Sequence, residues 1–201
     1  MARKDGTDDL RIKRTQKSIK EAFFDLSEKV GFEHISVKDI TDYAGISRNT
    51  FYLHYSDKYD LLNRICDELM RILFFRVGKQ LRRAQRGDFS VERVAAVIKL
   101  GLSAVEDNKR YYKILLSDFG ADILLEKISQ IIRLCLNLVK NDIDMLSEYS
   151  VEYIVDGMTG VIRYCVMHNV ENTENECLAF TKIHLGSIIN AANEKEKRVN
   201  E

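Results

Sequence analysis

Apolar residues recur along almost the whole chain at the three- and four-residue spacing that is typical of amphipathic helices. Glycines, or polar residues able to cap a helix, stand where these stripes begin or end. Gly31 ends the first stripe, Ser36 with Asp39 forms a capping-box variant, and Gly45 ends the second helix. The first half is therefore expected to hold four helices, over about residues 19–30, 36–45, 47–55 and 56–86. Gly78 marks a place where the long fourth helix could kink or be interrupted.

The second half continues with five more helical stripes and no strand pattern. Residues 122–141 are apolar nearly all round, which predicts a central, buried helix. Ser150 is expected to open the next helix, and Thr173 with Glu176 forms a capping box for the last one. The five helices are expected over about residues 90–105, 109–116, 122–141, 150–165 and 173–192. The prediction is an all-α fold of about nine helices, which the lack of proline favours.

Composition indicates a folded protein, and charge divides the chain in two. Of its 201 residues, 45% are apolar and 31% are charged, which excludes the disordered and membrane-spanning classes. Residues 1–86 carry a net charge of +5, whereas residues 87–201 carry a net charge of −5. This asymmetry indicates that the first half meets a polyanion, unless the surface charges are scattered by chance.

Location and cofactor chemistry follow from what the sequence lacks. No signal peptide follows Met1, and no apolar run reaches the roughly 18 residues that span a bilayer. The four cysteines lie far apart, as reduced thiols do, so we expect a cytoplasmic protein without a membrane partner. Cys165 and His168 share a helix face as half a metal site would, but no second pair completes it. We find no catalytic motif, and we expect no metal, no cofactor and no enzymatic activity.

The segment from Ser36 to Lys58 has the form of a helix-turn-helix: one helix, a tight turn at residues 44–46, and a second short helix. Positions expected to be exposed on the second helix are all hydrogen-bonding or cationic. Arg48 suits a bidentate contact to guanine and Asn49 a contact to adenine, while neighbouring polar side chains suit phosphates. Two other interpretations stay open. The hairpin could bind nothing, or the aromatic residues could be ordinary packing residues, which for Tyr55 is the favoured interpretation.

The run Gly-Ile-Ser-Arg-Asn-Thr-Phe-Tyr-Leu-His-Tyr-Ser-Asp-Lys at residues 45–58 resembles the tetracycline-repressor (TetR) family of bacterial transcriptional regulators. The resemblance covers roughly residues 12–70. It includes Phe23 and Leu26 in the preceding helix. The chain departs from the family at Asn49, where glycine is common, and at Tyr55, where phenylalanine is common. Residues 153–169 are similar to a subgroup related to activators of dihydroxyacetone-kinase operons.

The resemblance implies a helix-turn-helix DNA-binding domain at residues 10–70, with its motif at about 34–53. It also implies a C-terminal ligand-sensing and dimerisation domain at residues 71–201. The candidate DNA-binding residues are Ser36, Ser47, Arg48, Asn49, Thr50, Tyr52, His54 and Lys58. Of these, Arg48 and Asn49 map onto base contacts and most of the others onto phosphate contacts. A basic arm either reaches phosphates or is a solvated face, and it consists of Arg11, Lys13, Arg14, Lys17 and Lys20.

Two apolar stripes on the last helix, with Gly157 and Gly160 in the helix before it, predict a homodimer through the last two helices. The alternative is burial of both stripes inside a monomer. A ligand pocket among the C-terminal helices is a further expectation, although its residues fit plain core more readily. The candidate lining consists of Tyr111, Tyr112, Phe119, Met158, Tyr164 and His168.

These features together predict a sequence-specific transcriptional regulator, more often a repressor in this family, that binds a double-stranded DNA operator as a homodimer. Its DNA affinity would be controlled by an unknown small-molecule effector. The alternative is a transcriptional activator regulated by a protein partner. An enclosed C-terminal cavity would favour the effector, and a filled core with an exposed apolar patch would favour the protein partner.

Overall fold

The computed structural model describes residues 6–83, 91–117, 120–140 and 148–170, and the single positions 175, 179, 183 and 186. Regular structure in these ranges is helical throughout, as the spacing of apolar residues predicts, and they contain no strand. The elements are α1 Gly6–Val30, η1 Phe32–His34, α2 Val37–Ala44, α3 Arg48–Tyr52, α4 Lys58–Arg83, α5 Val91–Glu106, α6 Lys109–Ser117, α7 Ala121–Lys140 and α8 Glu148–Met167. The helix predicted over residues 173–192 lies outside the continuous described ranges, and the eight described α-helices agree with the others.

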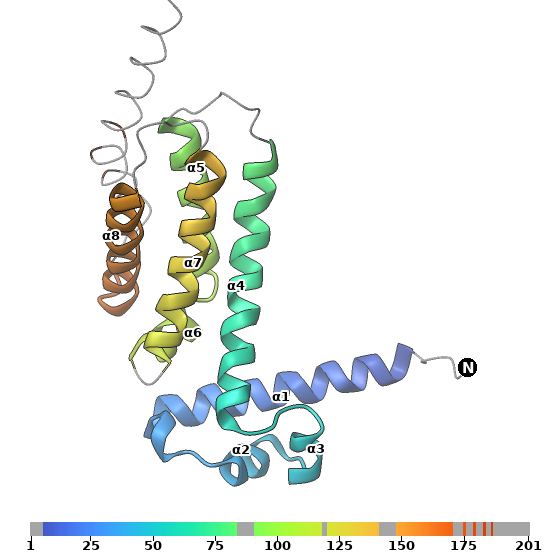
Figure 1. Ribbon diagram of the computed structural model, residues 1–201. Helices are drawn as coiled ribbons and strands as arrows, with labels where there is room; N and C mark the ends of the chain where they lie inside the picture. Colours follow the sequence, from blue (N-terminus) through green and yellow to red (C-terminus); the bar gives the residue numbers. More distant parts are fainter. Residues whose placement is uncertain are drawn as a thin grey trace, which may run out of the picture.

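A three-helix unit, made of α1, the 3-10 helix η1, α2 and α3, lies at one end of the molecule (Figure 1). Side chains from each of its helices and from the start of α4 meet in one core. The principal members are at most 3% exposed, and they are Ile19, Phe23, Phe32, Ile40, Phe51, Leu61 and Leu62. This core fixes α3 on the outside of the unit, because only Phe51 of its five residues is buried.

The body consists of α5–α8 and the turns of α4 that pack against them, and it stands above the three-helix unit in Figure 1. Its α7 differs from the prediction, because it is not buried all round: Glu126, Gln130 and Leu134 form an exposed stripe. The opposite face, with Leu124 and Ile128, is buried against α4, α6 and α8. Within the described part of the chain, no helix combines the length and apolarity needed to cross a bilayer.

Helix α4 connects the two parts. It has 26 residues and is therefore about 39 Å long. It runs through Gly78 without interruption, so the kink that the sequence allowed does not occur. Two consecutive carboxylates near its middle bind opposite parts of the molecule: Asp67 pairs with Lys127 of α7 at 2.6 Å, and Glu68 pairs with Lys20 of α1 at 2.6 Å.

Three helix boundaries also differ from the predictions. Helix α1 begins at Gly6, well before the start that the apolar stripe predicts near residue 19. Helix α3 ends at Tyr52 instead of near Tyr55, because the N–H groups of both His54 and Tyr55 turn back to the carbonyl of Phe51. Helix α8 begins at Glu148, so Ser150 lies inside its first turn and does not open it. The sequence marks residues that can cap a helix, but it does not say which of several nearby polar residues takes that position.

Candidate nucleic-acid interface

The start of α2 is held by a capping box. The backbone N–H of Asp39 donates to the Ser36 hydroxyl at 3.2 Å, and the backbone N–H of Ser36 donates to the Asp39 carboxylate at 2.8 Å. The Ser36 hydroxyl donates to the same carboxylate at 2.6 Å, and these bonds lower the pKa of Asp39. The predicted capping box is confirmed, and it leaves Ser36 exposed at the edge of the unit.

The turn between α2 and α3 depends on glycine. Gly45 has φ +67° and ψ 35°, the left-handed conformation that glycine adopts without steric cost. Its N–H bonds back to the last turn of α2, and the N–H of Ile46 donates to the carbonyl of Thr41 at 3.0 Å. The predicted helix end at Gly45 is therefore confirmed. These bonds set the direction in which the chain enters α3.

Ser47 caps α3, because its hydroxyl accepts from the backbone N–H of Thr50 at 3.1 Å. The two hydroxyls also bond to each other at 2.9 Å. That bond uses one of their two hydroxyl hydrogens, so the other stays available for an acceptor such as a phosphate oxygen. Ser47 and Thr50 thus hold the helix start and offer one further donor at its surface.

The remaining side chains of α3 lie outside the core. Arg48 and Asn49 are exposed, and Tyr52 is 55% exposed. The rings of Tyr52 and Phe51 meet edge to face, with their centres 5.6 Å apart. His54 is half-buried. Tyr55 is only 5% exposed, and burial raises its pKa, so the packing interpretation of this residue is confirmed. Arginine, asparagine and tyrosine are thus the groups that α3 presents outward.

Lys58, for which the sequence suggests a phosphate contact, is already bonded within the protein. Its ammonium donates to three backbone carbonyls: those of Phe32 at 3.1 Å, Glu33 at 3.2 Å and Ile35 at 3.0 Å. It also lies 4.6 Å from the centre of the Phe32 ring. Because an ammonium has three donors, all of them are used. Lys58 therefore fastens η1 to the start of α4, and any phosphate contact would replace one of these bonds.

Some cations of the basic arm are also paired within the protein, whereas others are exposed. Lys20 is paired with Glu68 of α4, and Lys13 is paired with Asp9 one turn earlier at 2.8 Å. Arg11 and Arg14 are exposed on α1, whose N-terminal part projects away from the rest of the unit (Figure 1). Lys20 therefore stabilises the packing of α1 on α4, whereas the exposed arginines stay candidates for phosphate contacts.

The structure does not bring the predicted pocket residues together. Tyr112 is buried in the body, Tyr111 faces α1, and Met158 is half-buried on α8. Tyr164 is 59% exposed, with its ring 4.4 Å from the ring of exposed His168, and Phe119 lies outside the described residues. A crevice between α5 and α8 measures about 10 Å³, room for about one water molecule. No group of three metal-ligating side chains occurs in the described ranges.

Sequence reasoning missed one residue beside α3. The side chain of Leu53 is 82% exposed directly after Tyr52. An apolar residue between polar ones is expected to be buried, so the sequence gives no reason to count Leu53 among the surface residues that could contact DNA. In a DNA complex an exposed aliphatic side chain next to a reading helix suits the methyl group of thymine.

The comparisons agree with this geometry. Residues 21–65 match the family described as bacterial regulatory proteins of the tetR family. Over 104 residues the chain is 32% identical to YxbF, an uncharacterized HTH-type transcriptional regulator of Bacillus subtilis strain 168. The alignment covers 49% of this chain and 26% of that protein, so the chain spans about a quarter of the length of this curated relative.

Solved structures share the fold over most of the chain. A putative TetR-family transcriptional regulator from Syntrophomonas wolfei strain Goettingen gives a TM-score of 0.71 at 15% identity, covering 86% of this chain and 96% of its own. The dihydroxyacetone kinase operon activator DhaS gives a TM-score of 0.57 at 19% identity, covering 89% and 96%. At these identities the likeness concerns the fold. The match at residues 21–65 covers the helix-turn-helix, so this part of the chain is similar to the tetR family of bacterial regulatory proteins.

Proposed function

We propose that the chain is a transcriptional regulator that reads a double-stranded DNA operator as a homodimer. The observation that carries the proposal is the short helix α3. Ser47 caps its start and Phe51 is buried beneath it, while Arg48, Asn49 and Tyr52 are exposed. A helix held in this way can place its N-terminal residues against base edges in the major groove.

Each exposed group has a distinct task in this proposal. Arg48 donates two parallel hydrogen bonds to a guanine, and Asn49 pairs with an adenine, so these two residues carry the sequence preference. Tyr52, Thr50 and His54 donate to phosphates, which hold the helix in register but do not distinguish bases. A further phosphate contact from Ser36, at the start of α2, would replace the bond that its hydroxyl donates to Asp39.

The operator is found by selecting duplexes from genomic fragments, and variants are then compared on it. Arg48→Ala is expected to weaken binding by roughly 5- to 150-fold, the cost of losing a bidentate base contact. Tyr52→Phe keeps the ring and removes only a phosphate donor, so a smaller loss is expected. Arg71→Ala is the matched control, because it removes an exposed arginine that lies about 20 Å along α4 from the start of that helix at Lys58. Unchanged binding by both α3 variants would contradict the proposal.

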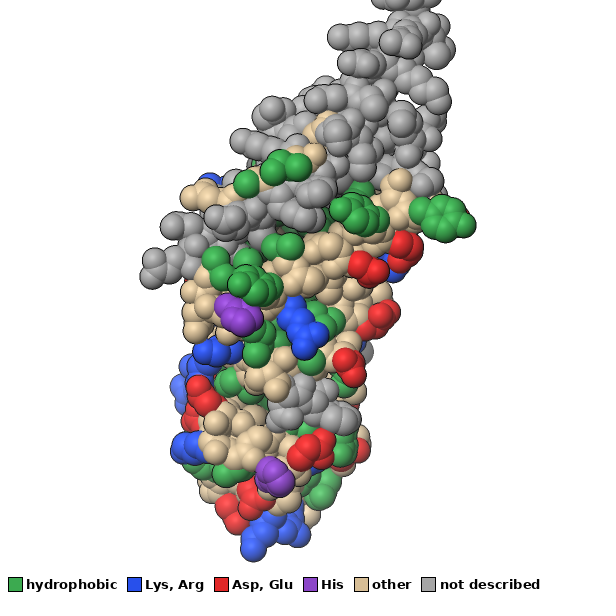
Figure 2. Space-filling view, turned by 90° about the vertical axis from the view of Figure 1, so that its left-hand side faces the viewer, with side chains coloured by type: hydrophobic (Ala, Val, Ile, Leu, Met, Phe, Trp, Pro, Cys, Tyr) green, Lys and Arg blue, Asp and Glu red, His purple; other side chains and the backbone are tan. Residues whose placement is uncertain are grey.

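The dimer is proposed to form through α8 and the helix that the sequence predicts over residues 173–192. Tyr149, Gly160 and Tyr164 lie on one face of α8, where the two tyrosines are 89% and 59% exposed. Apart from the two adjacent residues and the backbone of α8 itself, no atom of the described residues lies within 4 Å of the place where a Gly160 side chain would begin. Hydrophobic side chains also reach the surface on the side where α8 lies (Figure 2). Exposed aromatic residues beside a bare glycine suit close packing of two helices.

Gly160→Leu tests this arrangement by sedimentation. The monomer has room for the new side chain, so the fold is expected to survive while the dimer dissociates. Lys113→Leu, which changes an exposed residue of α6, is expected to leave the dimer intact. A wild-type protein that sediments as a monomer would contradict the homodimer.

Repression is the outcome we propose, because a dimer that covers its operator excludes other proteins from the same DNA. Deletion of the gene should then raise expression from the neighbouring promoter in a reporter assay. Expression that falls on deletion would indicate the activator.

A further inference from the structure

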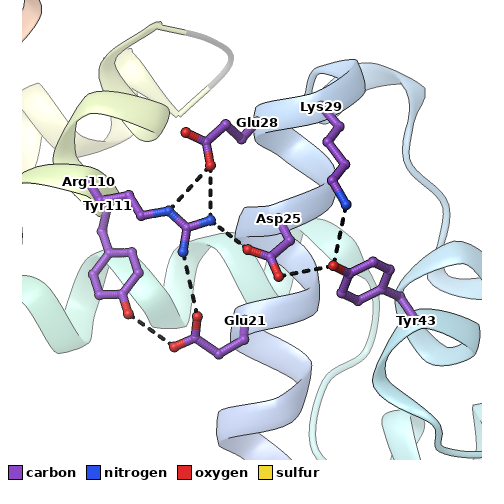
Figure 3. Close-up of polar contacts among 7 residues, drawn as sticks. All are labelled: Glu21, Asp25, Glu28, Lys29, Tyr43, Arg110 and Tyr111. Atoms are coloured by element: carbon purple, nitrogen blue, oxygen red, sulfur yellow. Dashed lines mark hydrogen bonds and ion pairs between the residues drawn. The ribbon is translucent and has the colours of Figure 1, made fainter.

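The three-helix unit is attached to the body by the first turn of α6. The guanidinium of Arg110 reaches three carboxylates that share one face of α1 (Figure 3). It lies 2.5 Å from Asp25, 2.9 Å from Glu28 and 3.8 Å from Glu21. These carboxylates stand four and three residues apart, so they would repel one another without a cation between them. One cation of the body thus offsets part of the negative charge of three carboxylates of the unit.

The contact continues from α1 to the helix-turn-helix. Asp25 binds Arg110 with one oxygen, and its other oxygen accepts from the hydroxyl of Tyr43 on α2 at 3.2 Å. Lys29 donates to the same tyrosine hydroxyl at 3.4 Å. Arg110, Asp25 and Tyr43 therefore form a continuous polar connection from α6 through α1 to α2.

The two residues that follow Arg110 fix this connection on both sides. Tyr111 stacks on Phe24 of α1 at 4.3 Å, and its hydroxyl donates to Glu21 at 3.1 Å. Tyr112 is 1% exposed in the core of the body. Arg110 and Tyr111 thus bind α1, while the next residue, Tyr112, packs inside the body. The position of α6 therefore sets the position of α1.

The bonds of Arg110 determine how the three-helix unit is oriented on the body more than they determine how stable the fold is. Arg110 is 45% exposed, and exposed ion pairs contribute little to folding. A guanidinium is a rigid planar fork, however, so several bonds from it define an orientation that a single ammonium would not define. Loss of Arg110 should therefore leave both parts folded while widening the range of angles between them.

We propose that Arg110 is a positioning residue that sets the angle of the three-helix unit on the body, and through it the half-site spacing that the dimer accepts. This inference rests on the proposed function. A dimer whose two reading helices are held at one separation binds half-sites at one spacing and loses affinity at others. A dimer with looser units tolerates several spacings.

The test uses a set of duplexes with the same half-sites and a spacing changed by up to two base pairs in either direction. Wild-type protein is expected to lose roughly 10-fold in affinity at the wrong spacings, and Arg110→Gln only a few-fold. Arg110→Lys keeps the charge without the fork and should be intermediate. Tyr43→Phe removes the last bond of the connection, together with the bond from Lys29, and should flatten the profile less than Arg110→Gln. Arg76→Gln, which breaks an ion pair to Asp107 inside the body, should keep the wild-type profile.

A second measurement needs no DNA. Spin labels carried by non-natural residues at exposed Asp42 of α2 and exposed Glu126 of α7 report the distance between unit and body. Arg110→Gln is expected to broaden the distance distribution, and Arg76→Gln is expected to leave it narrow. A protein that retains no duplex contradicts the proposed function, whereas an unchanged distribution in Arg110→Gln overturns the positioning role. An unchanged spacing profile overturns it equally.

Discussion

The three-helix unit and the body are both helical, but different forces fix their details. In the unit, polar groups of a few neighbouring residues decide where each helix begins and ends: the Ser36 capping box, the left-handed Gly45 and the Ser47 cap. In the body, long helices pack through apolar side chains that come from distant parts of the chain, such as Leu124 and Val155. Local hydrogen bonds thus fix the surface of the unit, which presents particular side chains. Burial of apolar side chains fixes the body, which supports that surface.

The largest expected effect tests whether the two parts are separable. Phe51→Ala empties the core of the unit and is expected to lower its free energy of unfolding by about 3–5 kcal/mol, while Leu124→Ala should cost the body about 2–5 kcal/mol. Both side chains are fully buried. At a temperature where most helical circular dichroism remains, only Phe51→Ala should abolish operator binding. Equal loss of binding in both variants would mean that the parts unfold as one.

Two glycines should respond to alanine with opposite sign. Gly45→Ala forces a side chain into left-handed backbone and is expected to destabilise the protein by roughly 1–2 kcal/mol. At Gly101 in α5 the new carbon would lie 3.6 Å from Leu73 and 3.7 Å from Val77, which is ordinary contact. Alanine is preferred inside a helix, so Gly101→Ala should stabilise by about 0.5–1 kcal/mol. Urea unfolding measures both, and a shared sign would refute the contrast.

Acid should act first on the three-helix unit. Three aspartates in or beside it accept hydrogen bonds that lower their pKa from the ordinary 3.8: Asp25 from Arg110, Asp39 from Ser36 and Asp60 from Arg64. The unfolded chain then binds protons at a higher pH than the folded chain does. Their stabilisation is therefore complete above about pH 5 and is lost as the pH falls below about 4. Thermal melting at several pH values measures this loss, and Asp39→Asn should reduce it.

At high pH, stability should fall because buried cysteine thiols lose their protons on unfolding. Burial raises the pKa of Cys66 to about 12 and that of Cys135 to about 11, from an ordinary 9.0. The folded chain keeps these protons when the unfolded chain has lost them, so stability is full below about pH 9 and falls as the pH rises above it. Alkylation followed by mass spectrometry at pH 8 should label both cysteines far more slowly in native protein than in urea. Equal rates would contradict their burial.

The sequence predicts most of the unit and little of the body's contacts, for physical reasons. A capping serine or a left-handed glycine acts on residues within one turn, so Ser36, Gly45 and Ser47 can be recognised in a single sequence. The outward position of Arg48 then follows from the length of the helix. The burial of Tyr55 is predictable too, because an aromatic residue four positions after Phe51 continues the buried face.

Contacts between distant residues escape this reasoning. Arg110 lies 85 residues from Asp25, and nothing near either residue signals the other. Lys58 suits a phosphate by its position, but the three carbonyls that hold it belong to a loop more than twenty residues earlier. Tyr111, Tyr164 and His168 have the chemistry of pocket residues, yet Tyr111 packs on α1 while Tyr164 and His168 lie together on the exposed surface of α8 and beyond its end. Residue type indicates chemistry, whereas helix packing decides which residues meet.

The adjacent carboxylates of α4 bear on protein engineering. Asp67 binds the body and Glu68 binds the unit, so the register of this one helix sets how the halves face each other. One residue inserted between Glu68 and Gly78 would turn everything beyond it by about 100° and shift it by 1.5 Å. Hybrid proteins that join this three-helix unit to a foreign C-terminal domain should therefore be joined in α4 without changing its residue count.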